Sequence, residues 1–258
     1  ARAPLRVRDV PPPVVSAAEA VIVDEASGAI LWAKNAHRQV SVASLTKIVT
    51  SLVALDRGRL EDRVAIGVDH RTLEDSTVMG LLPGEEFTLE DLLFGLMLPS
   101  GNDAGLAIAR YIGGSEQGFA AMMNAKADEL GLINSRFVNP HGLDEPGHYS
   151  SAYDMAMFAR HGMLQSQAFR RLAGTKVWTA RGKRGPYELW NLNRLLYGQY
   201  PGADGVKIGY TEDAGRTMVA SATRDGRRVY VSFMHSQNLV ADAGVLLDYA
   251  FNNFEWSD

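Results

Sequence analysis

Alternating apolar and polar positions predict β-strands near both ends of the chain. The run "AEAVIVDEASGAILWAKN" (18–35) reads as two strands joined at "ASG". After Asp204 three more alternating runs follow, "GVKIGYT", "RTMVASAT" and "RRVYVSFMH", and the turns between them are "EDAG" and "RDG". Successive hairpins indicate an antiparallel sheet, which we expect the first hairpin to join.

Apolar residues at helical spacing predict helices between the two strand regions. The apolar residues Leu45, Ile48, Val49, Leu52, Val53 and Leu55 predict a buried helix, and Gly58 is its expected end. "TLEDLLFGLMLPSGNDAGLAIARYIGG" (88–114) predicts two helices separated at "PSGN". "SEQGFAAMMNAKADELGL" predicts a third, which stops at Gly131, and "SAYDMAMFARHGM" a fourth. We expect the polar stretch 179–205 to be irregular and "LVADAGVLLDYAFNNF" to form a closing amphipathic helix.

These elements predict an α/β (α+β) fold, in which helices cover an antiparallel sheet and a mainly helical lobe is inserted into it. We expect a proline-rich leader over residues 1–19 and a single domain over 20–258. Within that domain, 20–68 and 201–258 form the sheet region, and 69–200 form the lobe. Helices from both ends of the sequence are expected to cover the sheet. A cleft between sheet and lobe is the natural place for a site.

Composition narrows the class of protein. The 258 residues are 46% hydrophobic and 22% charged, as in ordinary globular domains, and the net charge of −4 gives no reason to expect nucleic acid as a partner. The absence of cysteine excludes disulfides and cysteine nucleophiles. The six histidines lack ligand-like spacing, so we expect no metal and no cofactor.

The chain ends and its apolar runs bear on localisation. No apolar run approaches the roughly 18 residues of a membrane helix. The chain starts without Met, and its leader "ARAPLRVRDVPPP" is polar and stiffened by proline. This favours the stub that remains after a signal peptide is removed, and therefore an extracytoplasmic protein.

The motif S-x-x-K occurs at Ser44 and Lys47, at the start of the expected buried helix. Positions i and i+3 share a helix face, so the Nζ of Lys47 can reach the Oγ of Ser44. Burial favours the neutral form of a lysine, which can then act as a base toward the hydroxyl. A capping serine followed by a lysine that extends outward would give the same pattern, so this motif alone decides nothing.

The motif S-x-N occurs at Ser100 and Asn102, in the break between two predicted helices. A loop there is well placed to face a cleft. Both residue types also favour helix N-caps, and the same pattern recurs at Ser236 and Asn238, so the signal is weak by itself.

The motif K-x-G occurs at Lys207 and Gly209, within a predicted strand. A glycine there lets a backbone or a ligand approach closely. A lysine on an edge strand also discourages aggregation, and the rival Lys183 and Gly185 lie in a polar segment without strand pattern.

In this order and context the three motifs resemble the signature of serine penicillin-recognising enzymes. From Val21 to Phe254 the chain resembles the D-alanyl-D-alanine carboxypeptidase family, the low-molecular-mass penicillin-binding proteins. The resemblance is carried by "ASLTK", "LPSGNDA", "RFVNPHGLDEPGHYSSAYDMAMFAR", "GADGVKIGYTEDAGRTMVASATRDGRR" and "LLDYAF". It implies a serine carboxypeptidase that cleaves D-Ala-D-Ala in peptidoglycan stem peptides of the cell wall and binds β-lactams.

The resemblance also implies the roles of individual residues. Ser44 would be the acylated nucleophile and Lys47 its general base. Ser100, helped by Lys207, would relay a proton to the leaving amine, and Asn102 would hold the substrate amide.

By the same resemblance, one strand would bind substrate. Its residues are Ile208, Gly209, Tyr210 and Thr211. The backbone amides of Ser44 and Tyr210 would form the oxyanion hole, which is worth about 3 kcal/mol per donor.

Two positions depart from the family pattern. Ile208 stands where the usual K-T-G has threonine, and Leu239 where an arginine usually receives the terminal carboxylate of the substrate. We therefore expect altered carboxylate recognition. Arg216 is either a substitute cation or an ordinary surface arginine.

For the remaining polar and aromatic residues, we either expect a structural role or leave the role open. We expect His141 and His148 to organise their loop and Asp103 to brace the turn at "SGND". Trp190 and Tyr187 either line a peptide groove or pack in the core.

Several functions stay open at this stage. A DD-endopeptidase would use the same residues. A serine β-lactamase would share the motifs, but class A members usually carry S-D-N and an E-x-x-x-N loop, whereas this chain has Gly101 and no such loop before Lys207. An inactive binding or sensory protein on the same scaffold is disfavoured by the complete set of polar residues. The sequence leaves the oligomeric state undecided.

Overall fold

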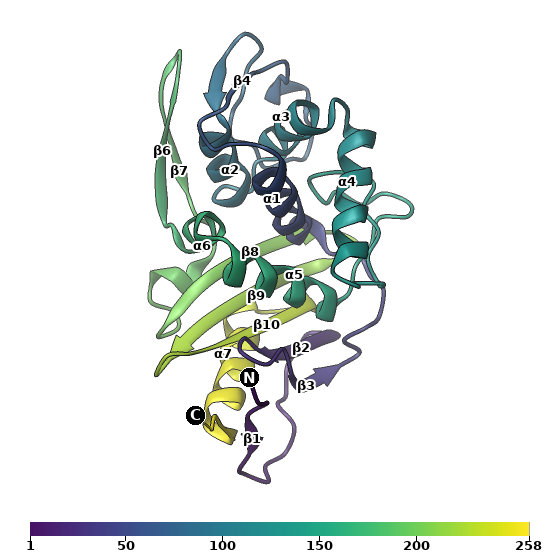
Figure 1. The fold of residues 1–258 in the computed structure, drawn as a ribbon, viewed down its shortest axis with the longest axis vertical. Helices are drawn as coiled ribbons and strands as arrows, with labels where there is room; N and C mark the ends of the chain where they lie inside the picture. The colour runs from purple at the N-terminus through teal and green to yellow at the C-terminus, as the bar shows by residue number, and fades with distance from the viewer. Residues whose placement is uncertain (258) are drawn as a thin grey trace.

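A five-stranded antiparallel sheet lies at the centre of the molecule, with strand order β3-β2-β10-β9-β8 (Figure 1). The structure is a computed structural model and describes residues 1–257. The N-terminal hairpin joins the C-terminal strands, as predicted, and β8 is an edge strand. The strands of the sheet are β2 (Glu19–Asp24), β3 (Ile30–Lys34), β8 (Ala203–Thr211), β9 (Gly215–Arg224) and β10 (Arg227–Ser236).

The alternation of side chains along the strands supplies two separate cores, one on each face of the sheet. On β10, Val229 and Val231 pack under α7 (Leu239–Asn253), which covers one face. Tyr230 faces the other side, where α5 (Ala152–Gln165) packs against the sheet. Every residue of β2 is buried, because its two neighbours and both covering layers enclose it.

The first long helix does not cover the sheet, contrary to the prediction. α1 (Thr46–Arg57) ends just before Gly58, as expected, but it is surrounded by α2 to α6. Only the preceding 3-10 turn, η1 (Ala43–Leu45), packs on β8 and β9. Residues 46–54 of α1 are all buried, and a sheet face would enclose only one side of the helix.

Helices assigned to the lobe by the sequence cover the sheet instead, since α5 packs against β2 and β10 and α6 against β8. Serine or threonine side chains cap the N-termini of α2, α4, α5 and α6, as the sequence pattern leads one to expect. The remaining helices are α2 (Leu89–Met97), α3 (Asn102–Gly113), α4 (Glu116–Glu129) and α6 (Gln167–Gly174), with short 3-10 turns at η2 (His70–Thr72) and η3 (Arg194–Tyr197).

The stretch predicted to be irregular contains a β-hairpin, formed by β6 (Val177–Gly182) and β7 (Gly185–Trp190). Figure 1 shows it as a long ribbon that extends beside the lobe. Its polar composition hides the strand pattern because most of its residues are exposed. It is anchored at its base, where Trp178 stacks on Phe94 of α2 with ring centroids 4.0 Å apart.

The proline-rich leader packs against the domain. β1 (Leu5–Arg6) pairs with β11 (Phe254–Glu255) at the end of the chain. The Asp242 carboxylate on α7 accepts hydrogen bonds from the leader at Ser16 and Ala17. A second short pair, β4 (Arg63–Ala65) and β5 (Glu86–Thr88), lies in the lobe. Among residues 1–257, no helix has both the length and the apolar character of a membrane span.

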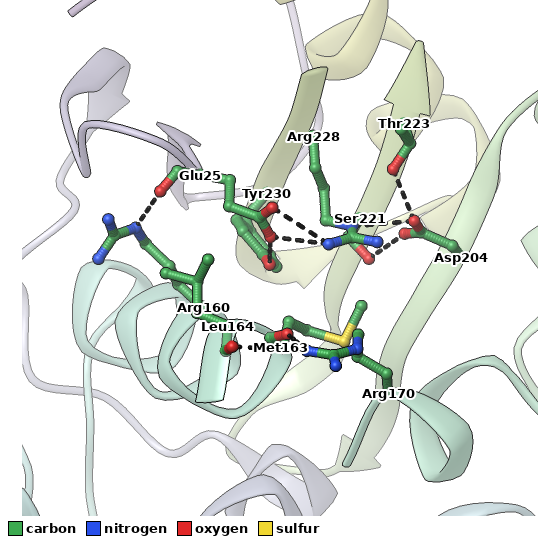
Figure 2. A network of polar contacts seen from close by, with 10 residues as sticks. All are labelled: Glu25, Arg160, Met163, Leu164, Arg170, Asp204, Ser221, Thr223, Arg228 and Tyr230. Atoms are coloured by element: carbon green, nitrogen blue, oxygen red, sulfur yellow. Dashed lines mark hydrogen bonds and ion pairs between the residues drawn. The ribbon is translucent and has the colours of Figure 1, made fainter. Parts of the chain in front are cut away.

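A polar network ties the edge strand to the rest of the sheet (Figure 2). Arg228 on β10 donates to Asp204 on β8 at 2.9 Å and to Glu25, just after β2, at 2.9 Å. Ser221 and Thr223 on β9 donate to the same Asp204 carboxylate at 2.6 and 2.7 Å. Arg228 therefore bridges two carboxylates, one on the edge strand β8 and one just after β2.

Replacing this arginine is expected to destabilise the protein. Arg228→Leu leaves the Asp204 and Glu25 carboxylates without their shared cation, and we expect a loss of about 2–3 kcal/mol in the free energy of unfolding. The matched control is Arg63→Leu, which removes a surface ion pair with Glu86 and should cost about 1 kcal/mol at most. Urea unfolding of both variants measures the difference, and equal losses would contradict the bridging role.

Candidate active site

The amine of Lys47 is the most enclosed polar group of the site. Lys47 lies in the first turn of α1 and is fully buried. Its Nζ lies 2.7 Å from the Oγ of Ser44, 2.7 Å from the Oδ1 of Asn102 and 3.0 Å from the carbonyl oxygen of His141. The contact predicted from the S-x-x-K spacing is therefore present. Burial, followed by the positive charge of Lys207, holds the pKa of Lys47 well below its usual range.

Ser44 lies between the first helix and the edge of the sheet. It is half-buried in η1, and the residue before it, Ala43, has a φ of 52°, a left-handed conformation that non-glycine residues rarely adopt. On β8, a Cβ at Gly209 would lie 2.7 Å from the backbone nitrogen of Ser44 and 2.8 Å from the Oγ1 of Thr217. Only a glycine allows the strand to approach the backbone of Ser44 this closely.

Ser100 lies in the break between α2 and α3, as predicted, and Asn102 is the first residue of α3. Ser100 has a φ of 62°, and Thr77 holds this strained backbone by donating to the Ser100 carbonyl oxygen at 2.5 Å. The amide of Asn102 donates to the carbonyl oxygen of Thr77 at 2.8 Å. Within the described residues, the buried Oγ of Ser100 has no hydrogen-bond partner. The hydroxyl of Ser100 is therefore not held by any other group among the described residues.

Asp103 braces this turn against the segment 79–81. Its carboxylate accepts hydrogen bonds from the backbone amides of Met79, Gly80 and Leu81 at 2.7–2.9 Å. It thereby fixes the segment around residue 80 onto the start of α3.

Lys207 is buried as well. Only 2% of its surface is exposed, and its Nζ donates to the carbonyl oxygen of Ile208 at 3.0 Å. Burial lowers its pKa to about 7. The lysine of the K-x-G motif therefore does not point into solvent, as a lysine that protects a sheet edge would.

The loop 138–148 organises the remaining wall of the site, and its two histidines have the structural roles expected of them. The Nδ1 of His148 accepts from the amide of Val138, so its Nε2 carries the proton and donates to the Oγ1 of Thr46 at 2.8 Å. The loop is thus fixed to α1. Burial lowers the pKa of His148 to about 4 and that of His141 to about 3, so both imidazoles are neutral at pH 7.

A cleft of about 350 Å³ opens in front of these groups. Each predicted substrate-binding residue of β8 lines it, as do Ser44, Ser100 and Asn102. Lys47 and Lys207 lie behind the wall. The sequence reading missed Asp75, Thr77, Gly142, Leu143 and Leu192, which also line the cleft. They lie on loops, and only the fold brings them together.

The two residues that depart from the family pattern both line this cleft. Ile208, Leu239 and Arg216 all line it. Arg216 is exposed and donates to the carbonyl oxygen of Gln237 at 3.3 Å, so its guanidinium lies over the start of α7.

The rival motifs and the aromatic candidates lie elsewhere. Lys183 lies in the turn of the β6–β7 hairpin. Asn238 caps α7. Neither Tyr187 nor Trp190 lines the cleft: the Tyr187 hydroxyl donates to Glu85, and Trp190 is exposed at the base of the hairpin.

Comparison with known proteins agrees with this geometry. A family model described as D-alanyl-D-alanine carboxypeptidase matches residues 6–238, which is most of the chain. The chain belongs to this family. Residues 44, 47, 100, 102 and 207, which carry the three motifs, all fall inside the matched region.

Curated members of the D-alanyl-D-alanine carboxypeptidase family are similar over most of the chain. DacF of Bacillus subtilis is 41% identical over 93% of the chain, and DacC of Escherichia coli is 39% identical over 84%. The chain spans 63% and 56% of the length of these two relatives. It spans 80% of DacB2 of Mycobacterium tuberculosis, which is 35% identical.

Solved structures share the fold. A D-alanyl-D-alanine carboxypeptidase of Mycobacterium tuberculosis matches with a TM-score of 0.89 and 32% identity, over 96% of this chain and 95% of that one. A DD-transpeptidase of Streptomyces matches with a TM-score of 0.88 and 31% identity, over 94% of this chain and 100% of that one. The predicted fold class, an α/β (α+β) fold in which helices cover an antiparallel sheet, is therefore confirmed.

The buried Lys207 should leave a signature in the pH dependence of stability. Its pKa is about 7 in the folded protein and about 10.4 in an unfolded chain, so between these values the unfolded state binds more protons. The free energy of unfolding of the wild type should therefore rise, relative to that of Lys207→Met, as the pH increases from about 7 to about 10. Urea unfolding of both proteins across this range tests it, and a difference that does not change with pH would refute the lowered pKa.

Proposed function

We propose that this protein is a serine-type D-Ala-D-Ala carboxypeptidase that acts on peptidoglycan stem peptides outside the cytoplasm and is acylated by penicillins at Ser44. The observation that carries the proposal is the environment of the Lys47 amine, which contacts Ser44, Asn102 and the His141 carbonyl together. Family membership and the cleft in front of Ser44 support it.

The three partners of Lys47 fit a neutral amine. The Oδ1 of Asn102 and the carbonyl oxygen of His141 are acceptors, and a neutral amine has two N–H groups to give them. Its lone pair is then directed to the third partner, the Ser44 hydroxyl, which donates its proton. The lowered pKa of Lys47 favours this neutral state, so the amine is ready to act as a general base.

The reaction then follows from the positions of the other groups. As Lys47 takes its proton, Ser44 Oγ attacks the peptide carbonyl, and the backbone amides of Ser44 and Tyr210 stabilise the oxyanion. Asn102 holds the substrate amide. The C–N bond breaks as the Ser100 hydroxyl, supported by the buried Lys207, passes its proton to the leaving amine and receives in its place the Ser44 proton held by Lys47. Lys47 is then neutral again and activates a water, which hydrolyses the acyl-enzyme and restores the serine.

Recognition of the substrate carboxylate is altered in this proposal. Ile208 and Leu239 present only carbon to the cleft at positions where the family resemblance leads one to expect a hydroxyl and a guanidinium. A lost hydrogen bond to a charged group costs about 1.5–3 kcal/mol. A small leaving group such as D-alanine therefore binds less tightly than in relatives with both polar groups.

The first test follows the acyl-enzyme. Wild-type protein should form a persistent covalent adduct with a labelled penicillin and release D-alanine from a D-Ala-D-Ala peptide. Ser44→Ala should do neither, and Lys47→Met should slow acylation by about 100-fold or more, because it removes the general base. Lys183→Met, in the hairpin turn outside the cleft, is the matched control. Adducts are counted by gel fluorescence and mass spectrometry.

Each unexpected outcome identifies a different function. Rapid turnover of the penicillin would assign a β-lactamase, and absence of any adduct on Ser44 would assign a binding protein on the same scaffold.

The second test restores the two missing polar groups. The double variant Ile208→Thr and Leu239→Arg should raise kcat/KM for the D-Ala-D-Ala peptide by about tenfold or more, because the terminal carboxylate regains hydrogen bonds. Its melting temperature is compared with that of the wild type to verify folding. A well-folded variant without a gain would show that carboxylate recognition is not weakened by these two residues.

A further inference from the structure

A second pocket of about 270 Å³ continues from the cleft around the edge of the sheet. The two spaces share four lining residues, Leu192, Ile208, Arg216 and Leu239, so they form one continuous surface. None of the residues that carry the proposed acyl transfer lines the second pocket. The pocket therefore lies beyond the groups proposed to carry out the acyl transfer.

The strand register explains why this pocket lies where it does. On β8 and β9 the paired residues are Ile208 with Met218 and Tyr210 with Arg216, which places these four side chains on the face covered by α7. Lys207 and Gly209 point to the opposite face, toward Ser44. Ile208 thus contributes to both the cleft and the pocket.

The lining of the pocket is apolar at its base and cationic at its rim. The apolar residues are Leu192, Ile208, Met218, Leu239 and Val240. Arg194 and Arg216 add two guanidinium groups, and among residues 1–257 neither pairs with a carboxylate. An apolar space bordered by two unpaired cations is complementary to an aliphatic chain that carries an anionic group.

The pocket lies on the leaving-group side of the proposed reaction, and the inference rests on that proposal. By the family resemblance, positions 208 and 239 face the terminal carboxylate of the substrate, which belongs to the leaving group, and both residues line the second pocket. The second pocket is lined by Ile208 but not by Gly209, Tyr210 or Thr211. A leaving amine with a long substituent would therefore extend past Ile208 into it.

We propose that this pocket binds the leaving-group half of a cross-linked stem peptide, an amine carried on an aliphatic arm whose carboxylate lies against Arg216. The arm fits the apolar base, which a free D-alanine leaves unfilled. Arg216 would bind this carboxylate from β9, whereas position 239, which carries only carbon here, is the first residue of α7. The protein would thus lack one carboxylate site and have another. Its preference would shift from the terminal D-alanine to the cross-link, which is the preference of an endopeptidase.

The test compares two substrates that share the same acyl half. One ends in D-alanine, and the other is a cross-linked dimer whose leaving amine belongs to a diamino acid with a free carboxylate. A third substrate is the dimer with that carboxylate amidated. Wild-type kcat/KM should be higher for the dimer than for the D-alanine substrate, and amidation should lower it by about tenfold or more.

Variants identify the residue that binds the carboxylate. Arg216→Gln should lower kcat/KM for the free dimer about tenfold, and amidation should then cost this variant nothing further, because the two changes remove the same interaction. Arg181→Gln, an exposed arginine on the β6–β7 hairpin, should leave all three values unchanged. If amidation lowers kcat/KM equally in the wild type and in Arg216→Gln, the assignment of Arg216 is overturned.

Binding without turnover separates this inference from the proposed function. The free leaving-group peptide, with its carboxylate intact or amidated, is titrated into wild-type protein and into Arg216→Gln by calorimetry. Binding that needs both the carboxylate and Arg216 supports the pocket even if Ser44 is never acylated. If Ser44 is acylated normally but this peptide shows no dependence on Arg216, the pocket assignment fails and the proposed function stands.

Discussion

The buried amine of Lys47 is the group on which the arrangement of this site depends. A lysine inside an apolar lobe is unfavourable unless its amine is neutral and hydrogen-bonded. Three separate parts of the chain meet this demand: Ser44 from the preceding turn, Asn102 from the start of α3 and the His141 carbonyl from a loop. The same three contacts prepare the hydroxyl for attack. Stability of the buried group and readiness for chemistry therefore have one physical cause.

The edge strand β8 divides two tasks between its faces. Lys207 and Gly209 face the nucleophile, and Gly209 is a glycine because a Cβ would meet the Ser44 backbone. Ile208 faces α7 and the second pocket. Substitution at this one position can change what the site recognises without moving the groups proposed to carry out the reaction. The network around Arg228 holds the start of the same strand, so β8 is fixed at one end and open to a ligand along its edge.

The sequence predicted those elements of the fold whose signal is local and missed those that depend on contacts between distant residues. Strand alternation and helix caps are local, and they placed the sheet strands, α1, the break at Ser100 and the stop after α4 correctly. The β6–β7 hairpin was missed, because its anchor is the stacking of Trp178 on Phe94, a contact between distant residues. The position of α1 inside the lobe was also missed, since hydrophobicity tells that a helix is buried but not which elements bury it.

By itself the sequence determined which chemical groups this protein carries, their order along the chain and the local elements that hold them, because spacing on a helix or strand fixes which side chains share a face. The lowered pKa of Lys47, the unpartnered hydroxyl of Ser100 and the pocket beyond Ile208 were decided only by the tertiary structure. Each of these properties depends on how water is excluded and which distant groups come near. Residues far apart in the chain set both, and no local pattern records them.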